Sequence, residues 1–353
     1  FVSLNVLFLF SCKKTVDTNT ENPNITPDFV TKVTSSVSGF VSNENNMPVS
    51  GATVKVGTVT VTTDQYGYFN ISNVEVVKDA ATVTVTNTGY FKGIKTYAAK
   101  EGKAAFFRIK LLPKTIIGSI DATTGGTASQ SNGLMITLPA NAVKNAATGA
   151  VYTGTVSVAA QFIDPTSTEI VKTMPGDLRA INSDGYMKLL TSYGMMAVEL
   201  TGASGELLQI ADGKKATITS TIPASILSTA PSTIPLWHFD EEKGLWIEEG
   251  VATKTGNNYV GEVSHFSFWN YDIANNYVHF ECTVFILNSA ARQPLPNAYV
   301  KISVASPPGM SSFGITDSSG YVAGFIPDHQ QLQLRVLQDY QCTGGALYFQ
   351  NFR

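Results

Sequence analysis

The sequence predicts an all-β, multidomain protein. Of its 353 residues, 43% are hydrophobic and only 14% are charged, whereas a typical soluble domain has about 25% charged residues. Thr, Ser, Asn and Gly supply the polarity instead, which favours short strands joined by turns over exposed helices rich in Glu, Lys and Arg. Stretches of alternating apolar and polar residues, separated by turns that contain Gly or Pro, recur along the chain.

The charge balance limits the classes of partner. The net charge is −3 and the sequence has no run of basic residues, so we expect no nucleic-acid partner. The apolar content is sufficient to build a core, and most of the chain is therefore expected to fold.

Residues 1–12 predict the end of a signal peptide. Residues 1–10, FVSLNVLFLF, are almost wholly apolar; they have the length of a signal-peptide hydrophobic region and are too short to span a bilayer. The motif Leu9-Phe10-Ser11-Cys12 resembles the lipobox of bacterial lipoproteins. That resemblance implies lipidation of Cys12 and an anchor in the cell envelope, with the outer membrane as the expected location. The alternative is an apolar strand that contains a buried Cys.

Residues 13–32 are polar and contain Pro23 and Pro27. The segment has no apolar periodicity around which to fold, so it predicts a flexible tether between the lipid and the first domain.

The first domain is expected at residues 33–113. Residues 48–56, PVSGATVKV, begin with a turn and continue as an alternating strand. Residues 64–69, DQYGYF, predict a tight chain reversal. The Asp64 carboxylate can accept from the backbone two residues on, and Gly67 can adopt a positive φ.

The same pattern returns near the C-terminus. Residues 294–302, PLPNAYVKI, share Pro-x-x-x-Ala-x-Val-Lys with the first domain, and residues 317–322, DSSGYV, share Asp-x-x-Gly-Tyr. These motifs resemble the carboxypeptidase regulatory-like domain, a transthyretin-like, Ig-like β-sandwich. The resemblance implies two such sandwiches, at residues 33–113 and 276–353. It also implies accessory modules without catalytic residues, as in secreted and surface proteins of the Bacteroidetes.

A larger β domain is expected between them, at residues 115–273. It includes residues 134–142, LMITLPANA, and residues 263–270, VSHFSFWN. These segments resemble the extracellular β-rich regions of FAM171-type proteins and of cartilage intermediate layer proteins. The resemblance implies an interaction or matrix module, again without catalytic residues.

A hairpin is predicted within this domain, with residues 240–244, DEEKG, as its turn. Side chains alternate along a strand, so Trp237 and Phe239 should pack into the core while His238 faces the other way. Trp246 lies on the returning strand and should cover the hairpin. Alternatively, Trp237, Trp246 and Trp269 could form an exposed platform on which sugar rings stack; burial in the core is the competing interpretation.

The sequence predicts no catalytic residues, no metal site and no cofactor. The four histidines are His238, His265, His279 and His329, and none is spaced as in His-x-His or His-x-x-x-His. We interpret His238 and His265 as hydrogen-bonded structural residues, and leave open a metal site assembled from distant positions.

The two cysteines that remain after lipidation of Cys12 are Cys282 and Cys342, both in the last domain. They are candidates for a disulfide, because the first and last strands of a sandwich can be close and the predicted compartment is oxidising.

These observations together predict a non-catalytic, lipid-anchored envelope protein that mediates binding or adhesion to a glycan or protein, with the sandwiches as spacers. The alternative is a glycan-binding or glycan-processing component of a polysaccharide uptake system.

Overall fold

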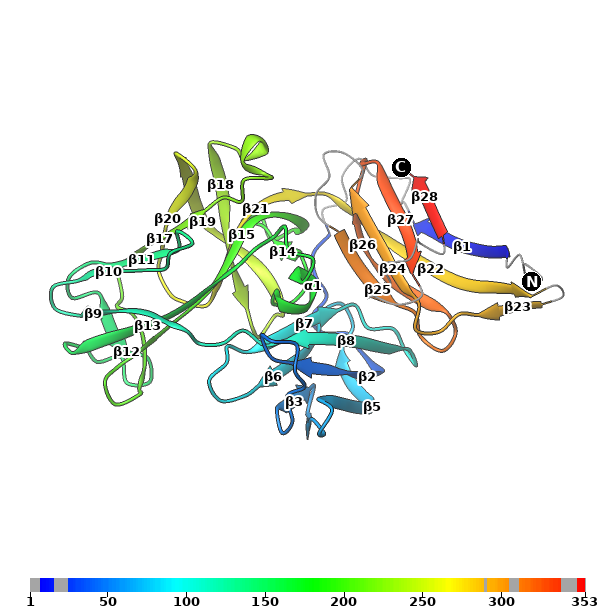
Figure 1. The fold of residues 1–353 in the computed structure, drawn as a ribbon, viewed down its shortest axis with the longest axis horizontal. Helices are drawn as coiled ribbons and strands as arrows, with labels where there is room; N and C mark the ends of the chain where they lie inside the picture. Colours follow the sequence, from blue (N-terminus) through cyan, green and yellow to red (C-terminus); the bar gives the residue numbers. More distant parts are fainter. Residues whose placement is uncertain (1–6, 16–24, 289–290, 305–310, 338–347, 353) are drawn as a thin grey trace.

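The computed structural model describes residues 7–15, 25–288, 291–304, 311–337 and 348–352. It confirms the predicted all-β class: a first sandwich, a large middle sheet and a second sandwich lie in mutual contact (Figure 1). Among these residues, no helix has the length and apolar character needed to cross a membrane.

The first sandwich consists of a three-stranded and a four-stranded sheet, in the orders β5-β2-β8 and β4-β3-β6-β7. Alternate residues of β2, among them Val37 and Val41, are buried between the two sheets. The strands are β2 (Lys32–Ser42), β3 (Thr53–Val56), β4 (Val59–Thr62), β5 (Tyr68–Val77), β6 (Ala81–Thr86), β7 (Gly93–Tyr97) and β8 (Ala104–Lys110).

The predicted tight turn before β5 forms as expected. The Asp64 carboxylate accepts hydrogen bonds from the backbone N–H groups of Tyr66 and Tyr68, at 2.8 and 2.9 Å. Gly67 has φ +73°, and a Cβ atom there would lie 2.3 Å from the carbonyl oxygen of Val41. Both constraints require glycine at this position.

The second sandwich repeats this strand order. β22 pairs with β26 as β2 pairs with β5, and β25-β24-β27-β28 corresponds to β4-β3-β6-β7. In both sandwiches a threonine hydroxyl stabilises the corresponding turn. Thr63 Oγ1 donates to the Val49 carbonyl at 2.6 Å, and Thr316 Oγ1 donates to the Leu295 carbonyl at 2.6 Å. The strands are β22 (Tyr277–Asn288), β23 (Ala291–Pro294), β24 (Tyr299–Val304), β25 (Ser311–Ile315), β26 (Tyr321–Pro327), β27 (Leu332–Leu337) and β28 (Tyr348–Phe352).

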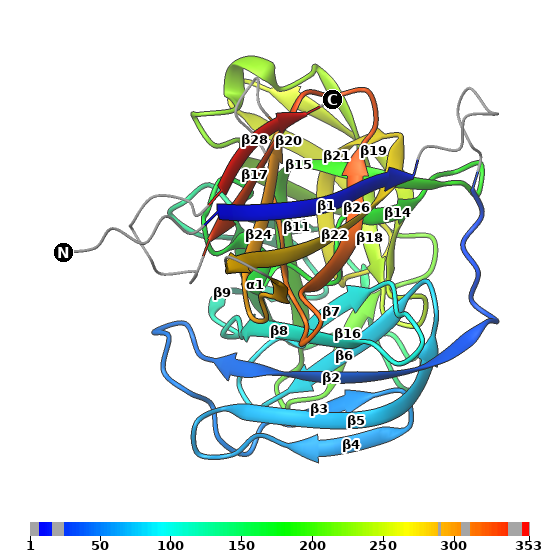
Figure 2. The same cartoon turned by 90° about the vertical axis from the view of Figure 1, so that its right-hand side faces the viewer.

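The N-terminal segment differs from the predicted tether. Strand β1 (Leu7–Thr15) pairs antiparallel with β22, on the edge opposite β26, and Figure 2 shows it lying along that strand. In the first sandwich, β8 covers the corresponding edge of β2. Pairing satisfies backbone N–H and C=O groups that an open edge would leave free. Residues 13–15 therefore belong to a strand and not to a flexible tether.

Residues 25–31 also contact the folded protein. The backbone N–H of Met187 donates to the carbonyl oxygen of Ile25 at 2.7 Å, and the Asp28 carboxylate accepts from the N–H groups of Val30 and Thr31. Only residues 16–24 of the expected tether lie outside the described residues.

The middle domain is a 13-stranded, mainly antiparallel sheet that curls around its own core. Its central path is β10-β11-β17-β20-β19-β18-β21-β15-β13-β9. The elements are β9 (Ile116–Asp121), β10 (Gly126–Ser129), β11 (Met135–Leu138), β12 (Val143–Asn145), β13 (Thr155–Ile163), α1 (Ile170–Thr173), β14 (Arg179–Ile181), β15 (Met187–Thr201), β16 (Leu207–Ile210), β17 (Ala216–Thr221), the 3₁₀ turn η1 (Leu227–Thr229), β18 (Thr233–Asp240), β19 (Leu245–Thr255), β20 (Asn258–Val263) and β21 (Phe268–Asn275).

Candidate functional site

The three tryptophans do not form a surface platform. Trp237, Trp246 and Trp269 are each 0% exposed, which agrees with the expected core packing and rules out the alternative of an exposed sugar-stacking platform. Each indole N–H donates to a backbone carbonyl, those of Asp272, Asp177 and His265 respectively. Large aromatic surface is most stable when buried with its polar group satisfied.

The predicted hairpin forms between β18 and β19, and it explains the burial of Trp237 and Trp246. Trp237 and Phe239 share one face, as expected, and the Phe239 and Trp246 rings meet edge to face at 5.3 Å. Their core also includes Phe91 and Ile94 of the first sandwich. Trp237 and Trp246 therefore help to join the first sandwich to the middle domain, whereas Trp269 packs in the middle domain's own core.

Lys95 lies inside this joint. It is 4% exposed, and its ammonium donates to the carbonyl oxygens of Val171 and Met174, at 2.8 and 2.6 Å, where α1 ends. Burial lowers the pKa of Lys95 to about 7, although the Asp177 carboxylate opposes the shift. Beside it, Thr96 Oγ1 donates to the Gly244 carbonyl at 2.6 Å.

Arg179 on β14 contacts all three parts of the protein. It is 1% exposed, and its Nε atom donates to the Asp177 carboxylate at 2.7 Å. Its Nη1 atom donates to the carbonyl oxygen of Asp79 in the first sandwich. Its guanidinium carbon lies 4.6 Å from the centroid of the Phe325 ring in the second sandwich. One side chain thus connects both sandwiches to the middle domain.

The two sandwiches also contact each other directly. Lys100 pairs with Glu281 at 3.2 Å and Lys103 with Asp317 at 3.5 Å, and both ammonium groups lie over the ring of Tyr321, at 4.7 and 5.2 Å. The three parts therefore form a closed triangle of contacts, which matches their arrangement in Figure 1.

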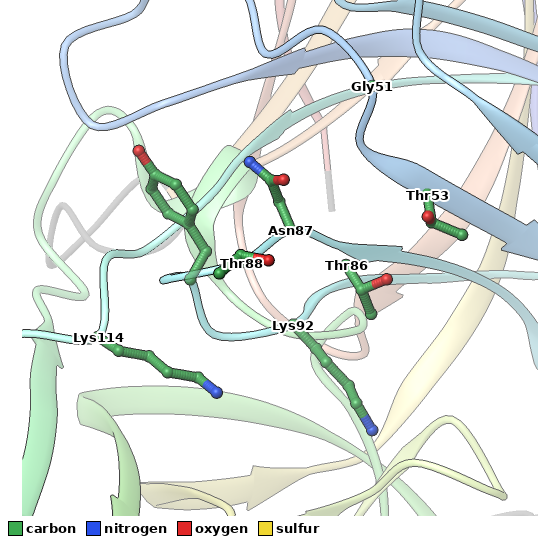
Figure 3. A pocket seen from close by; sticks show the side chains of 8 residues that line it. Gly51, Thr53, Thr86, Asn87, Thr88, Lys92 and Lys114 are labelled. Carbon is green, nitrogen blue, oxygen red and sulfur yellow. The ribbon is translucent and has the colours of Figure 1, made fainter. Parts of the chain in front are cut away.

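A hollow of about 440 Å³ opens on the first sandwich where it meets the middle domain. Figure 3 shows its polar lining: Gly51, Thr53, Thr86, Asn87, Thr88, Tyr90, Lys92 and Lys114. Lys92 pairs with Glu241 at 2.6 Å and Lys114 with Glu199 at 2.7 Å. Hydroxyl and amide groups therefore face the hollow beside two lysines whose charge is balanced.

A second cluster joins His238, Glu249 and His265 on the other face of the hairpin. His238 and Glu249 are diagonal neighbours, because His238 pairs with Ile247 and Glu249 is two residues further along β19. His265 lies between β20 and β21, close to Trp269, which pairs with His238. Glu249 Oε2 lies 3.5 Å from His238 Nε2 and 3.2 Å from His265 Nε2.

The cluster has the ligand types of a metal site. Burial, and then the neighbouring His265, lower the pKa of His238. Burial alone would raise the pKa of Glu249, but a hydrogen bond from Ser264 and the two imidazoles together lower it. Sequence spacing could not reveal this cluster, because strand pairing brings together residues 11 and 16 positions apart. Its only local signal was that both histidines lie beside aromatic residues.

Of the two cysteines predicted to form a disulfide, Cys282 is among the described residues. Cys282 is 1% exposed and is disulfide-bonded. Cys342 lies outside the described residues. The backbone of Cys12 pairs with that of Cys282 across β1 and β22, but the side chain of Cys12 is not among those described. Lipidation of Cys12 and a Cys282–Cys342 bond remain predictions.

Comparison with known protein families supports the prediction made for the first domain. Residues 36–111 match the carboxypeptidase regulatory-like domain, as expected for residues 33–113. The chain is 32% identical to human cartilage intermediate layer protein 2 over 126 residues, which are 35% of this chain and 10% of that protein. With the mouse protein it is 29% identical over 162 residues, covering 44% of this chain and 14% of the relative. The chain thus corresponds to a small part of these relatives.

Two solved structures match over most of this chain, with low sequence identity and low TM-scores. The Bacillus anthracis TIE protein is 15% identical, with a TM-score of 0.20, over 86% of this chain and 45% of that one. A putative carbohydrate-binding protein from Bacteroides uniformis is 8% identical, with a TM-score of 0.19, over 83% of this chain and 98% of that one.

Proposed function

We propose that this protein is a non-catalytic binding or adhesion protein of the bacterial cell envelope, in which the two sandwiches hold the middle domain in a fixed orientation. The observation that carries the proposal is the three-way junction at Arg179, where one buried side chain contacts all three parts of the chain. Spacers on flexible linkers would not bury a charged residue between them, because its desolvation requires closely fitted partners. The carboxypeptidase regulatory-like domain at residues 36–111 agrees with an accessory role.

Binding can be tested with the intact chain on an array of matrix proteins and glycans. The middle domain should not be used alone, because its Trp237 and Trp246 share a core with Phe91 and Ile94 of the first sandwich. We expect saturable binding to at least one class of ligand, with the ligand recovered unchanged. Turnover of a bound ligand would contradict the non-catalytic proposal.

The envelope location rests on the lipobox-like motif that ends in Cys12. In bacteria that express the full gene, Cys12→Ala should move the protein from the membrane to the soluble fraction, whereas Cys282→Ala should leave it in the membrane. Equal membrane association of the Cys12→Ala variant and the unmodified protein would contradict lipid anchoring.

Glycan binding remains the second candidate function. The feature that favours it is the polar hollow, because the tryptophans are buried. Neutral hydroxyl and amide groups such as Asn87 and Thr88 suit hydrogen bonding to a sugar. If a glycan binds, Asn87→Ala should weaken its binding, while Asn45→Ala, on another exposed turn, should not. Equal binding by both variants would argue against the hollow.

A further inference from the structure

We propose that His238, Glu249 and His265 bind a Zn²⁺ ion. The proposal goes beyond the envelope function, and it concerns a face of the middle domain that the junction with the sandwiches does not use. It rests on the distances between the candidate ligand atoms, their chemistry, and the groups that orient them.

The distances fit a tetrahedral ion. The candidate ligand atoms of the three residues all lie within 4.8 Å of one another. Glu249 Oε2 is 3.5 Å from His238 Nε2 and 3.2 Å from His265 Nε2. Bonds of 2.0–2.2 Å at tetrahedral angles place neighbouring ligand atoms about 3.3 Å apart. Small rotations of the side chains are therefore enough to bring all three onto one ion.

The ligand chemistry selects among ions. Two imidazoles and one carboxylate suit Zn²⁺ and its neighbours in the first transition row, whereas Mg²⁺ and Ca²⁺ prefer six or more oxygen ligands. A neutral imidazole is the form that binds metal.

Surrounding groups hold the ligands in place. Ser264 Oγ donates to Glu249 Oε1 at 2.6 Å, which leaves Oε2 directed at the imidazoles. The Trp269 ring lies 5.1 Å from the His265 ring and 5.7 Å from the His238 ring, and its indole N–H donates to the His265 carbonyl. Such outer contacts orient metal ligands and commonly change metal affinity by about 10–100-fold.

The cluster is accessible from solvent. The side chains of His238, His265 and Glu249 are 18%, 34% and 38% exposed. Three protein ligands leave one tetrahedral position for water. The ligands come from β18, β19 and the segment before β21, so a bound ion would tie that segment to the sheet and stabilise the folded state.

The proposal is tested by titrating Zn²⁺ into tag-free, chelator-treated full-length protein, with calorimetry for stoichiometry and thermal unfolding as a second readout. We expect one equivalent to bind and the melting temperature to rise. His265→Asn should abolish this binding. Glu249→Gln keeps the size of the side chain and its hydrogen bond to Ser264, so it should remain folded while losing the charged ligand and at least about tenfold in affinity.

His329→Asn is the matched control. His329 is 88% exposed and has φ +54°, a conformation that Asn adopts readily. This variant should bind Zn²⁺ as the unmodified protein does. Absence of saturable binding to the unmodified protein would show that the cluster is only a set of hydrogen-bonded side chains. Undiminished binding to folded Glu249→Gln would show that the ion binds elsewhere. Either result would overturn the proposal.

Discussion

The guanidinium group of Arg179 lies over the ring of Phe325, with 4.6 Å between the guanidinium carbon and the ring centroid. These residues are 146 positions apart, on β14 and β26. The same guanidinium donates hydrogen bonds to the Asp177 carboxylate and to the backbone carbonyl of Asp79. Arg179 therefore contacts the first sandwich, the middle domain and the second sandwich at one junction.

Arg179→Ala should therefore loosen the whole protein. Removing one member of a buried charged pair typically costs about 3–5 kcal/mol. We expect denaturant unfolding at a lower midpoint and a larger radius of gyration by small-angle X-ray scattering. Arg108→Ala is the control, because Arg108 is exposed and lies over the rings of Phe40 and Phe106 on the first sandwich. An unchanged radius and midpoint for Arg179→Ala would show that the junction does not depend on this residue.

Trp237→Ala should destabilise the joint between the first sandwich and the middle domain. Truncating a large buried aromatic residue typically costs about 3–5 kcal/mol, and the indole hydrogen bond to the Asp272 carbonyl would also be lost. Thermal unfolding of the full chain should shift to lower temperature. Tyr66→Ala, at a side chain 65% exposed, should change melting little. Unchanged melting of Trp237→Ala would show that the joint does not depend on this side chain.

Because of Lys95, the free energy of unfolding should depend on pH above about pH 7. Its pKa is about 7 in the folded protein and near 10.5 in the unfolded chain. Between these values the unfolded chain binds more protons, so the free energy of unfolding rises with pH, by at most about 1.4 kcal/mol per pH unit. Below pH 7 the lysine is charged in both states and contributes no slope.

The slope can be measured by urea unfolding between pH 7 and pH 9. Lys95→Met should remove it, whereas Lys92→Met, at a lysine with a 49% exposed side chain, should preserve it. A slope that persists in Lys95→Met would assign it to other groups.

The disulfide partner of Cys282 tests whether Cys12 is lipidated. A thiol that carries a lipid cannot also form a disulfide, so lipidation of Cys12 requires Cys342 as the partner of Cys282. Peptide mapping of the membrane-bound protein without reduction should yield a Cys282–Cys342 peptide pair that separates on reduction. A Cys12–Cys282 pair would contradict lipidation and would agree with the opposed backbones of β1 and β22.

The sequence determined those features that depend on neighbouring residues. Alternation placed Trp237 and Phe239 on one face and His238 on the other, and Asp64 with Gly67 specified the turn before β5. Asp-x-x-Gly-Tyr, repeated at residues 317–321, predicted the corresponding turn of the second sandwich. Periodicity and turn chemistry act over a few residues, and a single sequence displays them directly.

Tertiary structure alone decided what the distant residues do. Packing between the first sandwich and the middle domain buries Trp246 and places Lys95 at the end of α1. Pairing between strands brings His238, Glu249 and His265 together. Strand pairing and domain packing set these contacts. They depend on register and on complementary surfaces far apart in the chain, which no local pattern records.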